Sequence, residues 1–474
     1  MRVPQPSDYY SCMKQFDDDI ISGSILKSVW KITWPVVITQ LVAGVHGFLD
    51  HMMVGRYVGY EAQAAIGVSW QLFLVILVFL SSFFHGMNIL MARYSGRRDH
   101  DAINRVFFEV LKISVYLLLL FVAPVGYFAA PYLLQWVTTD EVMVYALPYL
   151  RLLFTGAYPL FIMFLLNGAF QSTGYPKIPL YFGIGTTIFK IIVSFILITG
   201  VGPFPEMGVL GAGIGTCIGP LPSVFIAFYL ILNHKVIIAP PKSLSFKMDW
   251  AVIRSVARIG IPSGIQAVLL NLGGAVLLGY IASLEGLATE ALAAYTVCYG
   301  QLFSLVTWTG FGLRAACATV MGQNIGAGKL ERGKKGVYVG AMVGFIWAAL
   351  LGILYWAIPG HLLRFISVTD ETVIEIGTEL LHFLSFSGLF VVVTLAFTGG
   401  LQGAGDTKRP MVIAFITQII VLLGICAFFQ QRGELTTTVI WSSILVAHLS
   451  RLTLTYAMFV QGKWKHIKVE LDHT

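Results

Sequence analysis

Ionisable side chains inside long apolar runs are the first candidates for chemistry in this sequence. Asp50 lies in an apolar run at about residues 30–54, and His46 precedes it by four residues. Residues four apart share one face of a helix, so the carboxylate and the imidazole are expected to be neighbours. A carboxylate in hydrocarbon is costly, and it can bind or release a proton when its surroundings change. Asp50 and His46 are therefore candidates for cation coupling. The alternative is that Asp50 is an acid at a helix end that faces water.

The helices that carry these residues are expected to lie in a lipid bilayer. The chain has 474 residues, of which 57% are hydrophobic and 12% are charged, and its mean hydropathy is +0.79. Soluble domains carry roughly 25% charged residues. Half that fraction leaves too little polar surface for a water-soluble protein of this size. The five cysteines are scattered and form no Cys/His cluster, so we expect no metal site and no cofactor.

Twelve apolar runs of about 20 residues or more predict twelve transmembrane helices in an all-α membrane protein. The runs lie at about residues 30–54, 64–90, 107–131, 144–168, 178–200, 208–232, 256–282, 290–320, 335–358, 375–400, 410–429 and 436–460.

The sequence repeats itself once, at a nearly constant offset. The segment 61–65 (EAQAA) returns at 290–294 (EALAA), and the segment 170–179 aligns with 401–410. Each repeat holds six predicted helices, so both halves enter the membrane in the same direction. They are then two six-helix bundles related by a pseudo-two-fold axis along the membrane normal, as in transporters built from parallel repeats.

The repeat and the polar segments predict five regions of the chain. These are an N-terminal segment (1–28), an N-lobe (29–232), a linker (233–255), a C-lobe (256–460) and a C-terminal tail (461–474). A solute is expected to bind between the two lobes.

The distribution of Lys and Arg predicts the orientation in the membrane. Loops at about 93–105, 233–255 and 329–335 are rich in Lys and Arg, whereas the alternate loops, such as 132–143 and 283–289, carry mostly acids. Both termini are therefore expected in the cytoplasm, with the chain in the inner (plasma) membrane. The same bias explains the net charge of +7 without a nucleic-acid partner.

Several motifs resemble those of one transporter family. They are FLDHMMVGRYVG (48–59), IGIPSG (259–264), LAAYTV (292–297), GQNIGAGK (322–329) and LQGAGDTKRP (401–410). In these segments the chain is similar to multidrug and toxic compound extrusion (MATE) transporters, over roughly residues 25–460. The resemblance implies ion-coupled export of organic solutes, and it places Asp50 where the family has a cation-coupling acid. The GQNIGAGK and LQGAGDTKRP segments are expected to be architectural.

The sequence departs from the family on the fifth predicted helix. Proton-coupled bacterial members often place an Asn and an Asp there, and the matching positions are Lys190 and Ser194. A lone ammonium at membrane depth should seek a carboxylate, carbonyl oxygens or water. We therefore expect Lys190 to contact Asp50, and we include Lys190 and Ser194 in the candidate coupling site. The alternative is that Lys190 reaches a membrane surface or bonds to carbonyls at a helix bend.

Sodium coupling is disfavoured because the acids of sodium-coupled members are missing. The family's glutamate on the seventh helix is absent near Asn271, and its aspartate on the tenth helix corresponds to about Val391. Sodium needs several oxygen ligands, preferably with a carboxylate. A proton is therefore the expected coupling ion.

Polar and aromatic side chains of the second half are candidates for solute binding. Arg314 would favour an anionic or carboxylate-bearing solute, and aromatic rings suit flat amphipathic ligands. Rings at the lipid interface and a packing role for His382 are the alternatives. Arg451 is expected to reach the cytoplasmic face. The candidate solute-binding residues are Arg314, Gln266, Asn271, Tyr299, Trp308 and His382.

These observations predict a secondary active efflux transporter rather than an enzyme. It would export small amphipathic organic solutes, including drugs and toxic compounds, as a monomer by proton antiport with alternating access between two lobes. A flippase for lipid-linked substrates is the alternative within transport, and a membrane-embedded enzyme is the alternative from another class. Against the enzyme, the sequence contains no HExxH, GxSxG or Walker A motif.

The predicted topology can be tested by cysteine labelling in intact cells. With both termini in the cytoplasm, Arg97→Cys and Arg332→Cys should be protected from a membrane-impermeant thiol reagent. Cysteines placed at about 132–143 and 283–289 should react. Labelling of position 97 or 332 from outside would contradict the topology.

Overall fold

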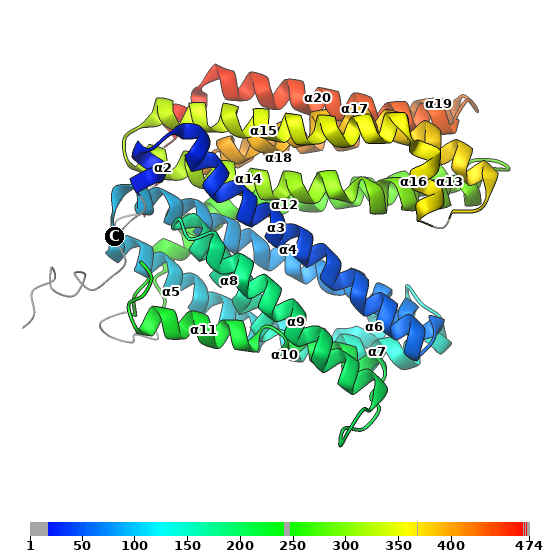
Figure 1. Cartoon of the computed structure of the whole chain (residues 1–474), viewed down its shortest axis with the longest axis horizontal. Coiled ribbons are helices and arrows are strands. Elements are labelled where there is room, and N and C mark those ends of the chain that lie inside the picture. The colour runs from blue at the N-terminus through cyan, green and yellow to red at the C-terminus, as the bar shows by residue number, and fades with distance from the viewer. Residues whose placement is uncertain (1–17, 241–246, 367, 468, 470, 472–474) are drawn as a thin grey trace, which may run out of the picture. The chain divides into compact units, whose positions relative to one another are not determined.

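The computed structural model describes residues 18–240, 247–366, 368–467, 469 and 471, with only the backbone at 18 and 45–48 (Figure 1). These residues form helices joined by short turns, and no strand occurs among them. The prediction of an all-α membrane protein is confirmed.

The helices of the first half follow the predicted order of apolar runs. They are α2 (Asp18–Ser22), α3 (Ile25–Tyr57), α4 (Tyr60–Arg97), α5 (His100–Leu117), η1 (Leu118–Val122), α6 (Ala123–Gln135), α7 (Asp140–Gly156), α8 (Tyr158–Ser172), α9 (Lys177–Thr199), α10 (Val209–Ile218) and α11 (Leu221–Leu232).

The helices of the second half also follow the predicted order. They are α12 (Trp250–Ala282), α13 (Ala288–Tyr295), η2 (Thr296–Leu302), α14 (Ser304–Gly326), α15 (Leu330–Ala357), α16 (Pro359–Phe365), α17 (Glu371–Gly403), α18 (Lys408–Phe415), η3 (Ile416–Leu423), α19 (Gly424–Gln431), α20 (Thr437–Gln461) and the short η4 (Lys463–His466).

Ten helices in the described part of the chain are long and apolar enough to cross a membrane, or eleven if α7 and α8 form one span. Those two helices meet at an angle of 50°, and Pro159 is the second residue of α8. Proline lacks a backbone N–H and interrupts helical hydrogen bonding, which explains the break. The remaining predicted span, 290–320, is helical from Ala288 to Gly326 as α13, η2 and α14. It carries Glu290 and Arg314 and is less apolar than the others.

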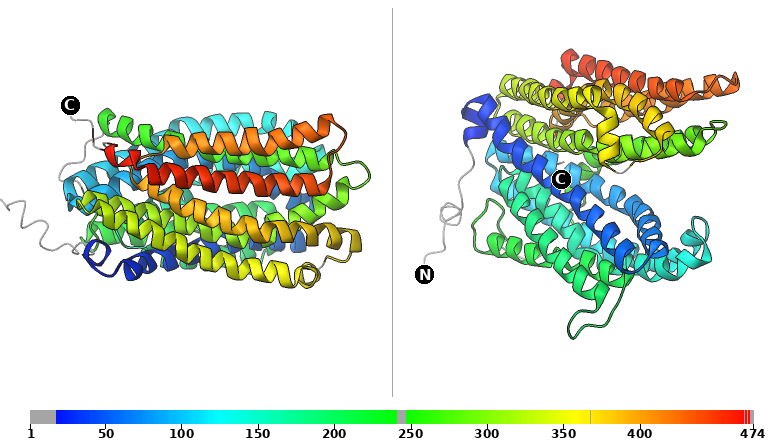
Figure 2. Two further views of the ribbon diagram at one scale, coloured as in Figure 1. Left: turned by 90° about the horizontal axis from the view of Figure 1, so that it is seen from above. Right: turned by 45° about the vertical axis from the view of Figure 1, so that its right-hand side comes forward.

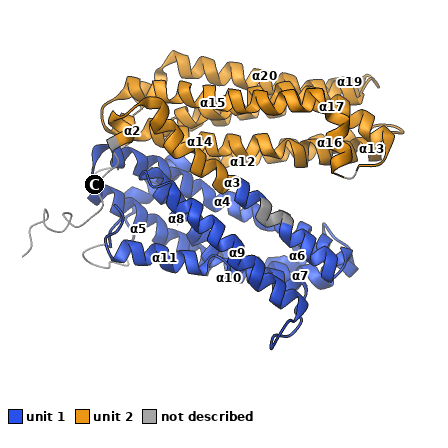
Figure 3. Ribbon diagram, in the orientation of Figure 1, with its two compact units in different colours: residues 1–18, 41–260, 470–474 blue, residues 19–40, 261–469 orange. Residues whose placement is uncertain are grey.

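The chain forms two compact units, which are coloured separately in Figure 3. Among the described residues, unit 1 contains 18, 41–240, 247–260 and 471, and unit 2 contains 19–40, 261–366, 368–467 and 469. This division differs from the predicted lobes: residues 29–40 group with unit 2, and residues 256–260 group with unit 1. In each half, the first long helix is divided between the units.

Side-chain packing explains both regroupings. Within unit 2, Val29, Ile32 and Val36 of α3 form an apolar cluster with Ala316 and Val320 of α14.

Within unit 1, the start of α12 lies very close to α4. A Cβ on Gly260 would lie 1.9 Å from the carbonyl oxygen of Ser82, and one on Gly86 would lie 2.2 Å from that of Val256. These contacts account for the unit to which each segment belongs.

Helix α17 is the central helix of unit 2, where it contacts α14, α15 and α20 (Figure 2). Glycines allow the closest of these approaches. A Cβ on Gly399 would lie 2.1 Å from the carbonyl oxygen of Arg314, and one on Gly403 would lie 2.3 Å from that of Ala318. Small residues four apart let two membrane helices pack backbone to backbone.

Gly399→Ala should destabilise the protein, because its methyl group would overlap the α14 backbone. We expect a loss of about 1–3 kcal/mol, the usual range for overpacking. The measurement is thermal unfolding of the purified protein in detergent micelles. Gly279→Ala on α12 is the control, since a Cβ there would have no atom within 4 Å. Equal unfolding temperatures for the two variants would contradict this account of the packing.

Candidate functional site

A buried ion pair joins α3 to α9 in unit 1. The Lys190 ammonium donates a hydrogen bond to Oδ2 of Asp50, and the two form a salt bridge. Asp50 is 7% exposed and Lys190 is 1% exposed. The contact expected between these residues is therefore present, whereas their role in coupling remains a prediction.

Two glycines of α10 and Gly219, directly after it, make room for the helix that carries Lys190. A Cβ on Gly211 would lie 2.6 Å from the carbonyl carbon of Leu197, and one on Gly219 would lie 2.8 Å from Cβ of Lys190. Between them, Gly215 lies against Ser194, whose Oγ would be 2.0 Å from such a Cβ. The spacing GxxxGxxxG at 211–219 is a sequence signal for close helix packing, and it is absent from the motifs on which the predictions above rest.

Polar groups of α7 and α10, and a second residue of α3, lie near the pair. Tyr149 of α7 is buried within electrostatic range of Asp50, and Cys217 of α10 is within range of Lys190. His51 follows Asp50 on α3 and interacts electrostatically with both members of the pair. Sequence reasoning singled out His46 instead, whose side chain lies outside the described residues.

Ser194 lies one turn after Lys190 and is completely buried. Its hydroxyl has no hydrogen-bond partner within the described part of the chain. An unpaired buried hydroxyl costs free energy, and such groups in native structures call for an explanation.

The pair's geometry permits two electrostatic states. With Asp50 ionised, the carboxylate and the ammonium compensate each other in an apolar environment. Protonation of Asp50 would cancel the carboxylate charge and leave the ammonium without its counter-ion. The helix that carries Lys190 would then favour a position where other oxygens or water could solvate it.

The six candidate solute-binding residues do not form one cluster in unit 2. Arg314 and Trp308 lie on either side of Phe311 on α14: the Arg314 guanidinium carbon is 5.5 Å from the Phe311 ring, and the rings of Trp308 and Phe311 are 6.3 Å apart. His382 of α17 packs 4.4 Å from the ring of Trp356. That contact agrees with the alternative in which His382 is a packing residue.

The other three residues make separate contacts. The side-chain oxygen of Gln266 accepts a hydrogen bond of 3.1 Å from Gln402, and exposed Asn271 donates one of 2.8 Å to the carbonyl of Ala267. Tyr299 stacks on Tyr295 at 5.0 Å. The six residues thus remain individual candidates.

Two carboxylates in loops outside the membrane spans accept hydrogen bonds from residues at helix ends. The Nε of Arg105 donates a hydrogen bond of 2.7 Å to the carboxylate of Asp249. The backbone N–H groups of Ala251 and Val252 donate to the same carboxylate. Partial burial opposes ionisation, but these partners outweigh it and hold the pKa of Asp249 below its usual range. At Asp406, burial raises the pKa of the carboxyl group, although Arg409 at 2.6 Å opposes the shift.

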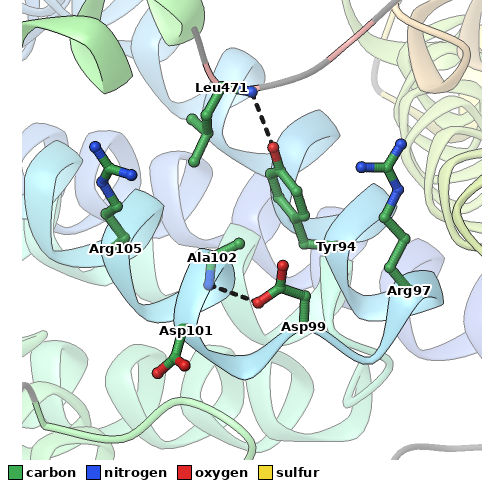
Figure 4. Close-up of a pocket in the computed structure, with 7 residues that line it drawn as sticks. All are labelled: Tyr94, Arg97, Asp99, Asp101, Ala102, Arg105 and Leu471. Carbon is green, nitrogen blue, oxygen red and sulfur yellow. Dashed lines mark hydrogen bonds between the residues drawn. The ribbon is translucent and has the colours of Figure 1, made fainter. Parts of the chain in front are cut away.

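A surface pocket of about 450 Å³ lies at the junction of α4 and α5 (Figure 4). Tyr94 accepts a hydrogen bond of 2.9 Å from the backbone of Leu471, and Asp99 caps α5 by accepting one of 3.0 Å from Ala102. Arg97, Asp101 and Arg105 complete the lining, so positive and negative charges are mixed. These contacts order the start of α5 rather than select one class of ligand.

Comparison with known proteins identifies the family of this chain. A family model described as MatE matches residues 35–196 and again residues 262–426. The chain belongs to the MatE family. Because one model matches twice, the comparison also confirms the internal repeat, and with the apolar helices it makes the chain a multi-pass membrane protein.

Curated relatives match this MatE chain along nearly its whole length. A probable multidrug resistance protein NorM of Thermotoga maritima is 24% identical over 466 residues, covering 96% of this chain and 97% of the relative. A multidrug export protein MepA of Staphylococcus saprophyticus is 23% identical over 444 residues, covering 92% and 94%.

Solved structures share the fold at low sequence identity. A MOP superfamily transporter from Pyrococcus furiosus superposes with a TM-score of 0.87 at 17% identity, covering 96% of this chain and all of that one. A multidrug resistance MATE family transporter in an outward-facing conformation gives a TM-score of 0.84 at 16% identity, covering 95% and 98%.

Removing only one partner of the ion pair should strongly destabilise unit 1. Asp50→Asn and Lys190→Met should each cost about 3–5 kcal/mol, because each leaves a buried charge uncompensated. The double variant should recover much of that loss. Thermal unfolding in detergent would measure all three. Strictly additive losses would contradict direct coupling between the two side chains.

Proposed function

We propose that this MatE protein is a secondary active exporter of amphipathic organic solutes, driven by proton antiport in the inner (plasma) membrane. The names of its relatives, which include multidrug resistance and export proteins, support drugs as the solute class. Both termini would lie in the cytoplasm, and the monomer would work by alternating access between two homologous lobes.

The buried ion pair of Asp50 and Lys190 is the observation that carries this proposal. An acid inside a membrane span is costly, and such acids mark proton relays and ion pathways in transporters. The pair links two helices of the same unit, so a proton that breaks it would change the forces between α3 and α9. A conformational change would then accompany proton binding.

The neighbouring ammonium favours a proton over sodium as the coupling ion. Sodium requires several oxygen ligands around one position. At Asp50 the Lys190 ammonium already occupies the carboxylate oxygen Oδ2, and its positive charge would repel a metal cation. A proton needs only the carboxylate itself.

The solute would meet aromatic and polar groups of unit 2 in this proposal. Trp308, Phe311 and Arg314 form a continuous row along α14. Such a row combines flat apolar surfaces with one positive charge, and it would suit an amphipathic ligand that carries an acceptor group.

The decisive variant removes both charges of the pair together. Asp50→Asn combined with Lys190→Met leaves no uncompensated charge, so the double variant should fold. A loss of transport can then be distinguished from a loss of folding. In proteoliposomes, this variant should show at least about a tenfold loss of export driven by an imposed pH gradient. A group essential for proton transfer commonly contributes at least this much.

A second ion pair of unit 1 provides the matched control. Lys112 donates a bond of 2.6 Å to Glu109 on α5. Combining Glu109→Gln with Lys112→Met should leave proton-driven export near the wild-type rate. Wild-type export by a folded Asp50→Asn/Lys190→Met protein, with unchanged dependence on the pH gradient, would overturn the proposed coupling.

A further inference from the structure

Arg451 of α20 is another intramembrane cation, and two hydrogen bonds orient it inside unit 2. Its Nε donates a hydrogen bond of 2.9 Å to the hydroxyl of Thr417, and its Nη2 donates one of 2.6 Å to the side-chain oxygen of Gln418. The expectation that Arg451 reaches the membrane surface does not account for these bonds. Thr417 and Gln418 are buried, whereas Arg451 is partly accessible.

The acceptors of Arg451 are neutral, so its charge is not compensated. No carboxylate in the described part of the chain lies within ion-pair distance of Arg451. Arginine stays protonated in proteins and has five N–H donors. The Nη1 group of Arg451 makes no hydrogen bond to the described residues. A cation inside a membrane span that has no counter-ion attracts an anion.

Two π-helical segments flank this arginine. Thr417 and Gln418 belong to η3, and Tyr299, which lies within electrostatic range of Arg451, belongs to η2. A π-helical turn is rare and occurs frequently at functional sites, because it re-aims side chains that a regular helix would point elsewhere. Here η3 supplies both acceptors of the guanidinium, and the Tyr299 ring of η2 lies 5.2 Å from that of Phe303, which lies against His448, one turn before Arg451 on α20.

Aromatic rings extend along α20 beside the arginine. Tyr295 stacks on Trp441 at 6.1 Å and on Tyr299 at 5.0 Å, and the Phe303 ring lies parallel to His448 at 6.4 Å. Tyr295 and Tyr299 are partly accessible.

One further polar group beside the arginine lacks a partner. His448 is 6% exposed, and its Nδ1 makes no hydrogen bond within the described residues. It lies within electrostatic range of Arg451. A neutral imidazole nitrogen could donate to an anion bound there.

We propose that Arg451, Tyr299 and His448 form a binding site in unit 2 for an aromatic carboxylate. The guanidinium would bind the carboxylate through its free Nη1 group, and the accessible tyrosine rings would contact the aromatic part of the ligand. Thr417 and Gln418 would position the guanidinium. The proposal stands on unit 2 alone and does not depend on proton coupling at Asp50.

Salicylate, a fluorescent aromatic carboxylate, is the probe for this site, and uncharged salicyl alcohol is its neutral counterpart. Equilibrium dialysis against the full-length protein in detergent would give both dissociation constants. Salicylate should bind more tightly than the alcohol. Arg451→Gln should weaken salicylate binding by at least about tenfold, since a hydrogen bond to a charged group contributes that much.

Arg151→Gln is the matched control. Like Arg451, Arg151 of α7 lies near a tyrosine, because its guanidinium carbon is 4.4 Å from the Tyr127 ring. Its Nε also donates to a neutral acceptor, the backbone carbonyl of Tyr127, at 3.3 Å. This variant should bind salicylate like the wild type. Equal binding of salicylate by wild type and Arg451→Gln, or equal binding of salicylate and salicyl alcohol by wild type, would overturn the proposal.

A measurement on the unaltered protein guards against a variant that does not fold. Phenylglyoxal modifies accessible arginines, and mass spectrometry identifies the modified positions. Arg451 should react, and salicylate should slow its modification without protecting Arg151. Failure of Arg451 to react, or equal rates with and without salicylate, would contradict an accessible anion site.

Discussion

The cost of placing charge in hydrocarbon is the constraint on which this structure depends. Asp50 and Lys190 can occupy the interior of a helical membrane unit because each compensates the other. That contact requires α9 to lie close to its neighbours, and the glycines of α10 permit the approach. A local electrostatic requirement is thus satisfied by the backbone packing of a whole helix. A proton that neutralises Asp50 would act on the same packing.

The two halves of the chain share a repeat but distribute charge differently. Unit 1 contains a compensated pair, whereas Arg314 and Arg451 of unit 2 have no carboxylate within ion-pair distance among the described residues. In unit 2, neutral oxygens and aromatic rings surround the cations instead. In the functions proposed above, unit 1 would respond to protons and unit 2 would contact anionic groups of organic molecules.

The sequence was sufficient for the helices, the repeat and the family, because apolar runs and repeated motifs are local signals. It also predicted the contact of Lys190 with Asp50, since a buried ammonium needs a partner. It did not predict the break before Pro159 or the regrouping of residues 29–40, which depend on tertiary packing. The hydrogen bonds of Arg451 were missed for a similar reason: their acceptors lie in a π-helical segment that no sequence pattern marked.

Infrared difference spectroscopy of the reconstituted protein tests the central claim most directly. The account predicts that acidification, or addition of a transported solute, changes the carbonyl band of a protonated carboxyl group. That band should be absent in Asp50→Asn and should shift in Lys190→Met, because the lysine is the nearest charge to the carboxylate. A carboxyl band that is identical in wild type and Asp50→Asn would contradict the account, since Asp50 would then not change its protonation state.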